Sequence, residues 1–393
     1  MKTVRPWVHL AISVMCVGFL GFAAPGFAGQ TVGVTDDTIK IGSFGALTGP
    51  YYLFGKLIMN GAEVVYNDVN KQGGIHGRKL TLIREDDRCD AATAIAAAKK
   101  LIYQHEVFMI HGGGCSNPAI AAREEIERAN VPWVVFAAVA DPITMPVAPY
   151  IWSTALTASR ESRAQVDFAK ARGAKRLAII AQHDAWGNAR YKPLVEKLKE
   201  EGIPPVADEE IGGDANDATT QVLRIRQANA DAILLVVYPK PAAIFVRDAH
   251  KFGYKPLYIG MTAISDLPEF QKQVGIAGAL DDFYSISQVG FTPDDPRMDR
   301  WRKLTEGLFP GDRLSVYNLF GIASAQVVVE VLKRAGRELT RERVKEEIEK
   351  LQNFDTGVYP GPITCTSTEH QCNKTPAWIK LEGDKIVHVV AKN

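Results

Sequence analysis

The stretch Met109-Ile110-His111-Gly112-Gly113-Gly114-Cys115-Ser116-Asn117-Pro118 joins the end of an apolar strand, a glycine turn and the start of an alanine-rich helix. Such a turn leaves free backbone N–H groups and the Ser116 hydroxyl at a helix N-terminus, and this arrangement suits an anion. The stretch therefore predicts a site for a carboxylate ligand. A capped strand-to-helix turn without a ligand is the alternative interpretation.

Strand-like and helix-like stretches alternate along the chain on both sides of this turn. The sequence predicts a first block with strands at 39–44, 80–84, 107–111 and 131–136 and helices at 54–70, 91–104 and 118–129. It predicts a second block with strands at 176–181, 203–210, 232–237 and 257–259 and helices at 161–172, 187–201, 218–228 and 242–252, followed by a largely helical region from 299 to 352. Short connections between such elements predict an α/β protein with two doubly wound lobes. Ligands bind such sheets at the carboxyl ends of their strands.

The N-terminal residues 1–28 have the features of a secretory signal peptide. Lys2 and Arg5 precede an apolar run over 7–24, and Gly26-Phe27-Ala28 supplies small residues for cleavage after Ala28. A lipid anchor at Cys16 is disfavoured because Val14-Met15 are not the small residues that such a site requires. A retained membrane helix is the other alternative. The sequence thus predicts an exported, periplasmic protein.

Charge and cysteine content exclude some classes of function. Removal of the signal leaves 46 − 2 = 44 basic against 45 acidic residues, a net charge of −1 that gives no electrostatic footprint for nucleic acid. The mature chain keeps Cys89, Cys115, Cys365 and Cys372. In an oxidising compartment this even number favours two disulfides over a metal site.

Enzyme motifs are incomplete in this sequence. His111-Gly112-Gly113-Gly114 resembles the oxyanion-hole motif of lipases, but the chain contains no Gly-x-Ser-x-Gly nucleophile elbow. Asn117 stands where a dinucleotide fingerprint needs its third glycine. We therefore expect neither an enzyme nor a bound metal or cofactor.

Several ordered motifs resemble the Leu/Ile/Val-binding solute receptors of bacterial ABC importers. The motifs are Ile39-Lys40-Ile41-Gly42, Leu47-Thr48-Gly49-Pro50, Phe54-Gly55, Asn60-Gly61-Ala62, Gly73-Gly74-Ile75-His76-Gly77-Arg78, Asp86-Asp87-Arg88-Cys89-Asp90 and the glycine turn itself. The resemblance extends from about Ile39 to the C-terminus. It implies a type I periplasmic binding protein fold with three crossovers, expected near Ala155, Ser287 and Thr375. The expected lobes are 29–155 plus 288–375 and 156–287 plus 376–393.

The resemblance also implies roles for individual residues. Ser116 matches the hydroxyl that holds the ligand carboxylate, and the loop 136–142 would add a carbonyl near Ala138 and N–H groups near Ala140. Cys89 and Cys115 match a disulfide of the branched-chain receptors. Cys365 and Cys372 have no counterpart there, and their close spacing suggests a local loop clamp.

Two departures from the family pattern concern the ligand. Amino-acid receptors have a threonine where this chain has Ala140, and an acid that pairs with the ligand ammonium where it has Thr262. A buried ammonium without a carboxylate partner is costly, so the chain is poorly equipped for an α-amino acid.

Aromatic residues fall at positions that line the cleft in the family. These residues are Phe54, Trp186, Tyr238 and Phe320, with Tyr51 and Tyr52 on the same loop as Phe54. Flat apolar walls suit a planar ring, which indicates a benzoate- or phenylpropenoate-like acid. Ordinary core packing is the alternative for each ring. His111 and His183, at strand ends, are either donors to the ligand or structural residues.

These observations predict the solute-binding subunit of an ABC importer, a monomer that closes two lobes around a small aromatic carboxylate. Its partner would be a permease in the inner membrane. A receptor for an aliphatic branched-chain amino acid or amide is the first alternative. A periplasmic ligand sensor that contacts a signalling partner is the second.

Overall fold

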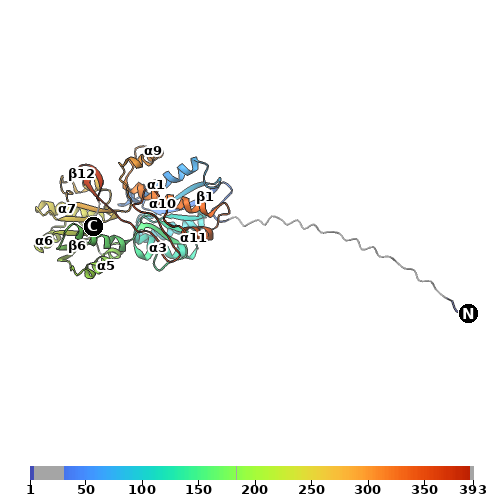
Figure 1. Cartoon of the computed structure of the whole chain (residues 1–393), viewed down its shortest axis with the longest axis horizontal. Helices are drawn as coiled ribbons and strands as arrows, with labels where there is room; N and C mark the ends of the chain where they lie inside the picture. The colour runs from blue at the N-terminus through green and yellow to red at the C-terminus, as the bar shows by residue number, and fades with distance from the viewer. Residues whose placement is uncertain (4–30, 183, 390–393) are drawn as a thin grey trace. The chain divides into compact units, whose positions relative to one another are not determined.

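The computed structural model describes residues 1–3, 31–182 and 184–389. All but the first three residues of the predicted signal peptide lie outside this part of the chain, as does His183. Strands from Thr38 onward form two separate sheets, and Figure 1 shows helices around each of them. We call each sheet with its helices the first and the second lobe. The predicted two-lobed α/β fold is confirmed.

The first sheet has six strands in the order β11-β5-β4-β3-β1-β2, and all of its pairs are parallel. The strands are β1 (Thr38–Gly45), β2 (Lys79–Asp86), β3 (Met109–Gly112), β4 (Trp133–Val135), β5 (Ile151–Leu156) and β11 (Gln371–Asn373). Every residue of β3, β4 and β5 is buried, as expected of parallel strands that are covered on both faces.

The second sheet has seven strands in the order β13-β12-β10-β9-β8-β6-β7. The strands are β6 (Leu177–Ala181), β7 (Ala207–Glu210), β8 (Ala232–Val236), β9 (Leu257–Gly260), β10 (Phe283–Ser287), β12 (Ala377–Glu382) and β13 (Lys385–Val389). Strand β12 pairs antiparallel with both β10 and β13, and all other pairs in this sheet are parallel. The chain passes between the sheets three times: after β5, after β10 and after β11.

Helices cover both sheets. The first lobe contains α1 (Tyr52–Lys71), α2 (Ala91–Lys99), α3 (Ser116–Arg128), α9 (Asp299–Leu308), α10 (Val316–Ala335) and α11 (Arg341–Glu349). The second lobe contains α4 (Ala158–Ala171), α5 (Ala185–Glu200), α6 (Thr219–Gln227), α7 (Pro239–Lys251) and α8 (Leu267–Val274). The helix predicted over 91–104 ends in a π-helical turn, Lys100–Gln104.

Strands β5 and β10 are among those for which the sequence predicts no range. Each contains buried polar residues that interrupt the apolar run, among them Thr154 and Ser285. The Thr154 hydroxyl donates to the Val135 carbonyl over 3.1 Å, and the Ser285 hydroxyl donates to the Met261 carbonyl over 2.8 Å. These hydrogen bonds offset the cost of burial, so the strands form although their hydrophobic pattern is weak.

Helices α1 and α10 cross at two glycines in the first lobe. A Cβ atom at Gly61 would lie 2.0 Å from the Asn318 carbonyl oxygen, and one at Gly321 would lie 1.9 Å from the Ile58 carbonyl oxygen. The Asn318 side chain also donates to the Leu57 carbonyl over 2.8 Å. The two backbones are therefore in direct contact, which requires glycine at both positions.

Within the described residues, α10 is the one helix long and apolar enough to cross a membrane by length and composition. Most of this helix is buried inside the protein. This burial, together with its packing against α1, identifies α10 as a core helix of the first lobe.

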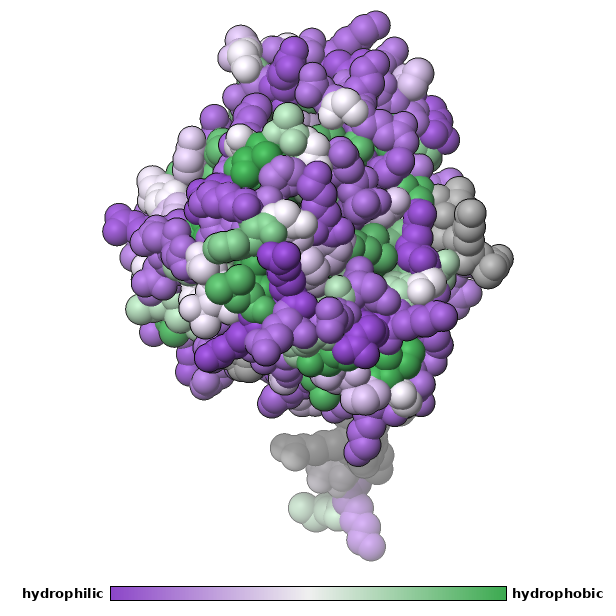
Figure 2. All heavy atoms as spheres, turned by 90° about the vertical axis from the view of Figure 1, so that its left-hand side faces the viewer, coloured by the Kyte–Doolittle hydropathy of each residue, from purple (hydrophilic) through white to green (hydrophobic). Residues whose placement is uncertain are grey.

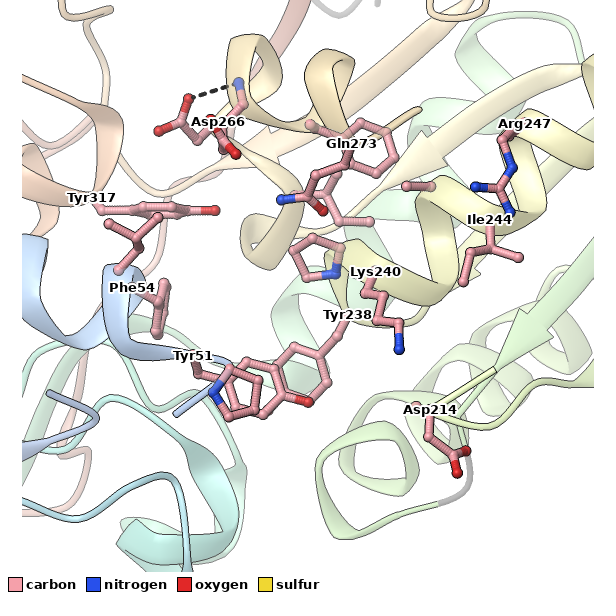
Figure 3. Close-up of a pocket in the computed structure, with 18 of the residues that line it drawn as sticks. Tyr51, Phe54, Asp214, Tyr238, Lys240, Ile244, Arg247, Asp266, Gln273 and Tyr317 are labelled. Atoms are coloured by element: carbon pink, nitrogen blue, oxygen red, sulfur yellow. Dashed lines mark hydrogen bonds between the residues drawn. The ribbon is translucent and has the colours of Figure 1, made fainter. Parts of the chain in front are cut away.

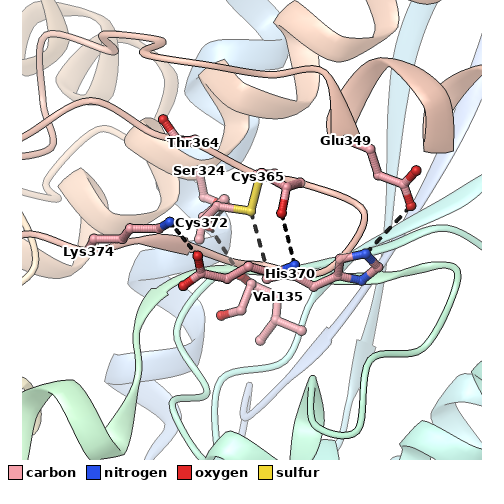
Figure 4. The surroundings of a disulfide bond; sticks show 12 residues. Val135, Ser324, Glu349, Thr364, Cys365, His370, Cys372 and Lys374 are labelled. Atoms are coloured by element: carbon pink, nitrogen blue, oxygen red, sulfur yellow. Dashed lines mark hydrogen bonds and ion pairs between the residues drawn. A yellow bond between two sulfur atoms is a disulfide. The ribbon is translucent and has the colours of Figure 1, made fainter.

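The disulfide between Cys365 and Cys372 closes a short loop next to β11, as Figure 4 shows. The Thr364 N–H donates to the Cys372 carbonyl over 3.2 Å. Nδ1 of His370 is hydrogen-bonded to the Ile151 carbonyl oxygen at 2.8 Å. The loop is thus attached to β5, and the structure contains the local clamp that the cysteine spacing suggested.

The side of the molecule that carries α6 and α7 is mainly hydrophilic, with apolar residues in small groups (Figure 2). Leu223 of α6 and Phe252, which follows α7, are 45% and 37% exposed. Apolar residues scattered in this way are usual on the surface of a globular protein.

Candidate functional site

Each sheet has a point at which the strand order reverses. In the first sheet β2 and β3 flank β1, and in the second sheet β7 and β8 flank β6. At such a point, the loops after the two neighbouring strands run to opposite faces of the sheet. A crevice therefore opens between these loops at the carboxyl edge of the sheet. The segments that follow β1, β3, β6 and β8, each a loop and the first turn of the next helix, contribute residues to one cleft.

The cleft consists of an outer cavity of about 880 Å³ and an inner chamber of about 60 Å³. The residues that line both spaces are Tyr51, Phe54, Tyr238, Pro239 and Tyr317. In Figure 3, Phe54 and Tyr317 lie on one side of the outer cavity, while Tyr238, Lys240 and the α7 residues Ile244 and Arg247 lie on the other. Ligand pockets usually measure roughly 300–1,000 Å³, so the outer cavity has room for a small molecule and the inner chamber does not.

Aromatic rings form the walls where the two spaces meet. The Tyr238 ring stacks on Trp186 with 4.0 Å between centroids, and it lies 5.1 Å from the ring of Tyr51. Phe54 and Tyr317 meet edge to face at 5.0 Å. Burial raises the pKa of Tyr51 and of Tyr238, so both phenols stay protonated. Because Tyr51 belongs to the first lobe and Tyr238 to the second, this aromatic cluster spans the cleft.

A buried ion pair lies at the second-lobe end of the inner chamber. Nε of Arg190 donates to Oε2 of Glu161 over 2.8 Å, and the guanidinium carbon lies 3.9 Å from the Trp186 ring centroid. The Thr262 hydroxyl donates to the other oxygen of Glu161. The side chains of Arg190 and Glu161 are 1% and 0% exposed. Burial raises the pKa of Glu161, and the Arg190 charge opposes that rise.

Arg190 is the only charged residue among the described residues that line the inner chamber. Thr262 lines the chamber, and the carboxylate of Glu161 is hydrogen-bonded on its far side. An acid is therefore present near the position where the family pattern places one, but a cation of the protein itself already pairs with it.

The glycine turn forms the first-lobe end of the chamber. Gly114 and Cys115 line the chamber, and Ala137 from the loop after β4 lies beside them. The disulfide between Cys89 and Cys115 ties the turn to the loop that follows β2. The disulfide pairing implied by the family resemblance is present.

Hydrogen bonds join this turn to the loop 136–142. Gly113 has φ +95°, a conformation that favours glycine, and its carbonyl accepts from the Ala138 N–H over 2.9 Å. The Ser116 hydroxyl oxygen accepts from the Val139 N–H over 3.3 Å. Ser116 begins α3, so the unpaired N–H groups of the first helical turn lie at this end of the cleft.

The structure brings together four of the residues predicted from the sequence. Phe54, Trp186, Tyr238 and Thr262 all line the inner chamber. Ser116 and Ala138 are buried and directly follow the lining residues Cys115 and Ala137, and Ala140 is buried two residues farther along.

The remaining predicted residues lie elsewhere. Phe320 is 1% exposed and packs edge to face on Tyr317 at 5.8 Å, so it supports the wall from behind. Tyr52 is 45% exposed at the start of α1. His183 falls outside the described residues.

His111 lies in the core of the first lobe rather than in the cleft. Its Nδ1 is hydrogen-bonded to the Tyr66 hydroxyl at 2.7 Å, and its Nε2 to the Ser324 hydroxyl at 2.8 Å. Burial lowers the pKa of His111 to about 3, so the ring is uncharged at neutral pH. This environment favours the structural interpretation of His111.

Three residues of the site are absent from the sequence prediction. Arg190 follows Trp186 by one helical turn of α5, and Glu161 lies near the start of α4. Nothing local in the sequence indicates that these two residues are buried together. Tyr317 precedes Phe320 by three residues. Once the N-cap at Ser315 shows that α10 begins at Val316, this spacing places both rings on the same face of the helix.

Comparisons with known proteins identify the family of this chain. A family model described as "Periplasmic binding protein" matches residues 38–382. The Leu/Ile/Val-binding protein homolog 7 of Brucella abortus (strain 2308) is 30% identical over 311 residues, which cover 75% of this chain and 77% of the relative.

Solved structures with the same fold include the following two. A fatty acid ABC transporter substrate-binding protein from Thermomonospora curvata has a TM-score of 0.81 at 23% identity, over 92% of this chain and 93% of that chain. An ABC transporter solute-binding protein from R. palustris, in complex with 4-hydroxybenzoate, has a TM-score of 0.78 at 21% identity, over 90% of this chain and 96% of that chain. With the family match, these likenesses confirm the resemblance read from the sequence motifs. The chain belongs to the periplasmic binding protein family and is of the Leu/Ile/Val-binding type.

Proposed function

We propose that this protein is the extracytoplasmic solute-binding subunit of an ABC importer and that its ligand is an aromatic carboxylate. The observation that carries the proposal is the make-up of the inner chamber, where aromatic rings from both lobes surround a space lined by Arg190, and the nearby acid Glu161 is paired with that arginine. A ligand ammonium would meet a guanidinium there instead of a free carboxylate. Proteins of this family bind small molecules and work with membrane permeases.

The glycine turn supports a carboxylate at the first-lobe end. Gly114 and Cys115 line the chamber immediately before α3, and the first N–H groups of this 13-residue helix have no helical acceptors. Ser116 adds a hydroxyl whose oxygen already accepts one backbone N–H, so its proton is available to a carboxylate oxygen. The helix dipole favours negative charge at the same place.

The aromatic walls support a planar ring between the two ends. The inner chamber of about 60 Å³ is lined by the stacked rings of Tyr238 and Trp186, so we propose that a ligand ring enters when these rings part or binds on the outer side of Tyr238. Parting these two rings requires a rearrangement within the second lobe, to which both belong. We propose that the lobes, 29–155 plus 288–375 and 156–287 plus 376–393, close about crossovers near Ala155, Ser287 and Thr375. The mature protein, cleaved after Ala28, would act in the periplasm as a monomer without catalytic activity.

An aliphatic branched-chain amino acid is the second candidate ligand. The name of the Brucella relative favours it, and Glu161 is an acid close to the chamber. For Glu161 to receive a ligand ammonium, Arg190 would have to leave its present position over Trp186.

Thermal unfolding of the mature protein, stripped of carried-over ligand, separates these candidates. A ligand at 100 times its Kd should add about 2.7 kcal/mol of stability. We expect this stabilisation from benzoate- or phenylpropenoate-like acids and none from leucine or valine. Stabilisation by leucine or valine alone would overturn the aromatic assignment.

A further inference from the structure

Arg190 has more N–H donors than it has acceptors in the described part of the chain. A guanidinium carries five N–H donors. Among the described residues, the acceptors are Glu161 for Nε and the Trp186 carbonyl for Nη1, at 2.8 and 3.3 Å, and Nη2 has none. Arg190 is nevertheless 99% buried, and the space that it lines is the inner chamber. A buried guanidinium with unused donors beside a chamber is suited to a ligand acceptor.

Thr262 offers the complementary group at the same end. Its hydroxyl proton is donated to Glu161, which leaves the lone pairs of the hydroxyl oxygen as acceptors. Thr262 and Arg190 line the same chamber. This end of the chamber thus presents one acceptor and at least one donor, held in place by one carboxylate that contacts both side chains.

We propose that Arg190 and Thr262 form a subsite for a hydroxyl group on the ligand ring, at the end opposite to the carboxylate. A phenolic hydroxyl accepts from the guanidinium and donates to Thr262, whereas an ammonium only donates and is repelled by Arg190. Because the glycine turn belongs to the first lobe and the subsite to the second, the two polar groups of the ligand stand at opposite ends. The ligand class is therefore a para-hydroxylated aromatic acid. This inference rests on the proposed function.

Calorimetric titration with 4-hydroxybenzoate and benzoate tests the subsite. The wild-type protein should bind 4-hydroxybenzoate about 10-fold or more tightly than benzoate, as expected for a hydrogen bond to a charged group. In the variant E161Q/R190M the ratio of the two Kd values should fall to about 2 or less. The matched control is R163M/E200Q, because this ion pair also joins α4 to α5 but is exposed. The control should keep the wild-type ratio.

Each result has a defined meaning. Equal affinity of the wild type for both acids overturns the hydroxyl subsite but leaves the aromatic-acid function standing. A preference for the hydroxylated acid that survives in E161Q/R190M also overturns the subsite. Binding of neither acid, with binding of leucine, overturns both proposals. If E161Q/R190M does not fold, Thr262→Val decides, because it keeps the side-chain shape and removes the acceptor; an unchanged Kd ratio in Thr262→Val then overturns the subsite.

Discussion

The Tyr238 ring covers the Trp186 ring, with 4.0 Å between centroids and 22° between planes. Tyr238 caps α7 and Trp186 lies in the first turn of α5, so the stack joins the two loops that flank the reversal point of the second sheet. Any ligand that enters the inner chamber changes the surroundings of this tryptophan.

Tryptophan fluorescence should therefore report binding of an aromatic acid. We expect a saturable change in emission on titration, and we expect Trp186→Phe to abolish most of it while the protein stays folded. Trp378 is the control, because it stacks on Phe168 at 3.8 Å within the second lobe. Trp378→Phe should keep the response, and loss of the signal only in Trp378→Phe would contradict the placement of the site.

Replacement of Ser116 by alanine should weaken carboxylate binding by about 1 kcal/mol, or roughly fivefold in Kd, because one donor is lost from a site built largely of backbone. Calorimetry measures the change. Ser43→Ala serves as control, since this buried hydroxyl has no hydrogen-bond partner in the described part of the chain. An unchanged Kd for Ser116→Ala would show that Ser116 does not bind the ligand carboxylate.

Replacement of Arg190 alone should lower the free energy of unfolding far more than replacement of both Arg190 and Glu161. Arg190→Met leaves Glu161 buried without its partner, at an expected cost of about 3–5 kcal/mol in the free energy of unfolding. The double variant E161Q/R190M should lie much closer to wild type, because a neutral pair needs no counterion. Urea unfolding of both variants measures the difference, and equal losses would contradict the coupling.

The instability of Arg190→Met should also depend on pH. Burial raises the pKa of Glu161 in the folded protein, and the Arg190 charge no longer opposes this in the variant. The folded state then holds a proton that the unfolded state, with a pKa of about 4.3, has lost. Stability should therefore rise as the pH falls from 7 toward 5. Urea unfolding at both pH values checks the sign, and a variant that is less stable at pH 5 than at pH 7, relative to wild type, would contradict it.

Gly61→Ala should destabilise the first lobe by about 1–3 kcal/mol, because the added Cβ would lie 2.0 Å from the Asn318 carbonyl oxygen. Gly307→Ala is the matched control in another helix, α9, where no atom lies within 4 Å of the added Cβ. This control should be neutral or slightly stabilising. Thermal unfolding compares the two, and equal stability would mean that α1 and α10 shift apart at no cost.

The two disulfides should differ in their effect on stability. Cys89 and Cys115 are 26 residues apart, and Cys365 and Cys372 are seven apart. Loop-closure entropy predicts losses of about 3.5 and 2.4 kcal/mol when each pair is replaced by alanine. Denaturant unfolding measures both losses, and thiol titration of the unreduced mature protein should find no free thiol.

The fold could be predicted from local sequence patterns, whereas the positions of the aromatic residues were implied by the family resemblance. Regular alternation of strands and helices defines doubly wound sheets, and the turn at Gly112–Gly114 directly follows a buried strand. Trp186 and Tyr238 follow β6 and β8, which are neighbours in the second sheet, so the sheet order brings the two residues together. Phe320, one helical turn beyond Tyr317 on α10, packs on the Tyr317 ring and stays a prediction as a ligand contact.

The ion pair beneath Thr262 could not be predicted in the same way. Glu161 and Arg190 are 29 residues apart on different helices, and each looks like an ordinary surface residue of an amphipathic helix. Only the packing of α4 against α5 shows that they are buried together. Because Thr262 stands where amino-acid receptors have an acid, the sequence suggested that this site contains no acid. The structure shows an acid at this site from another element, Glu161 of α4.

The crossing of α1 and α10 through Gly61 and Gly321 also affects how new ligands can be accommodated. Phe54 and Tyr317 are carried by these two helices, so the backbone contact fixes both rings to one rigid block. The opposing residues Trp186, Tyr238 and Thr262 stand at the ends of strands, on loops and first helical turns. Selection or engineering for a different solute should therefore first change the cleft residues of the second lobe. The first-lobe residues Phe54 and Tyr317 should stay the same.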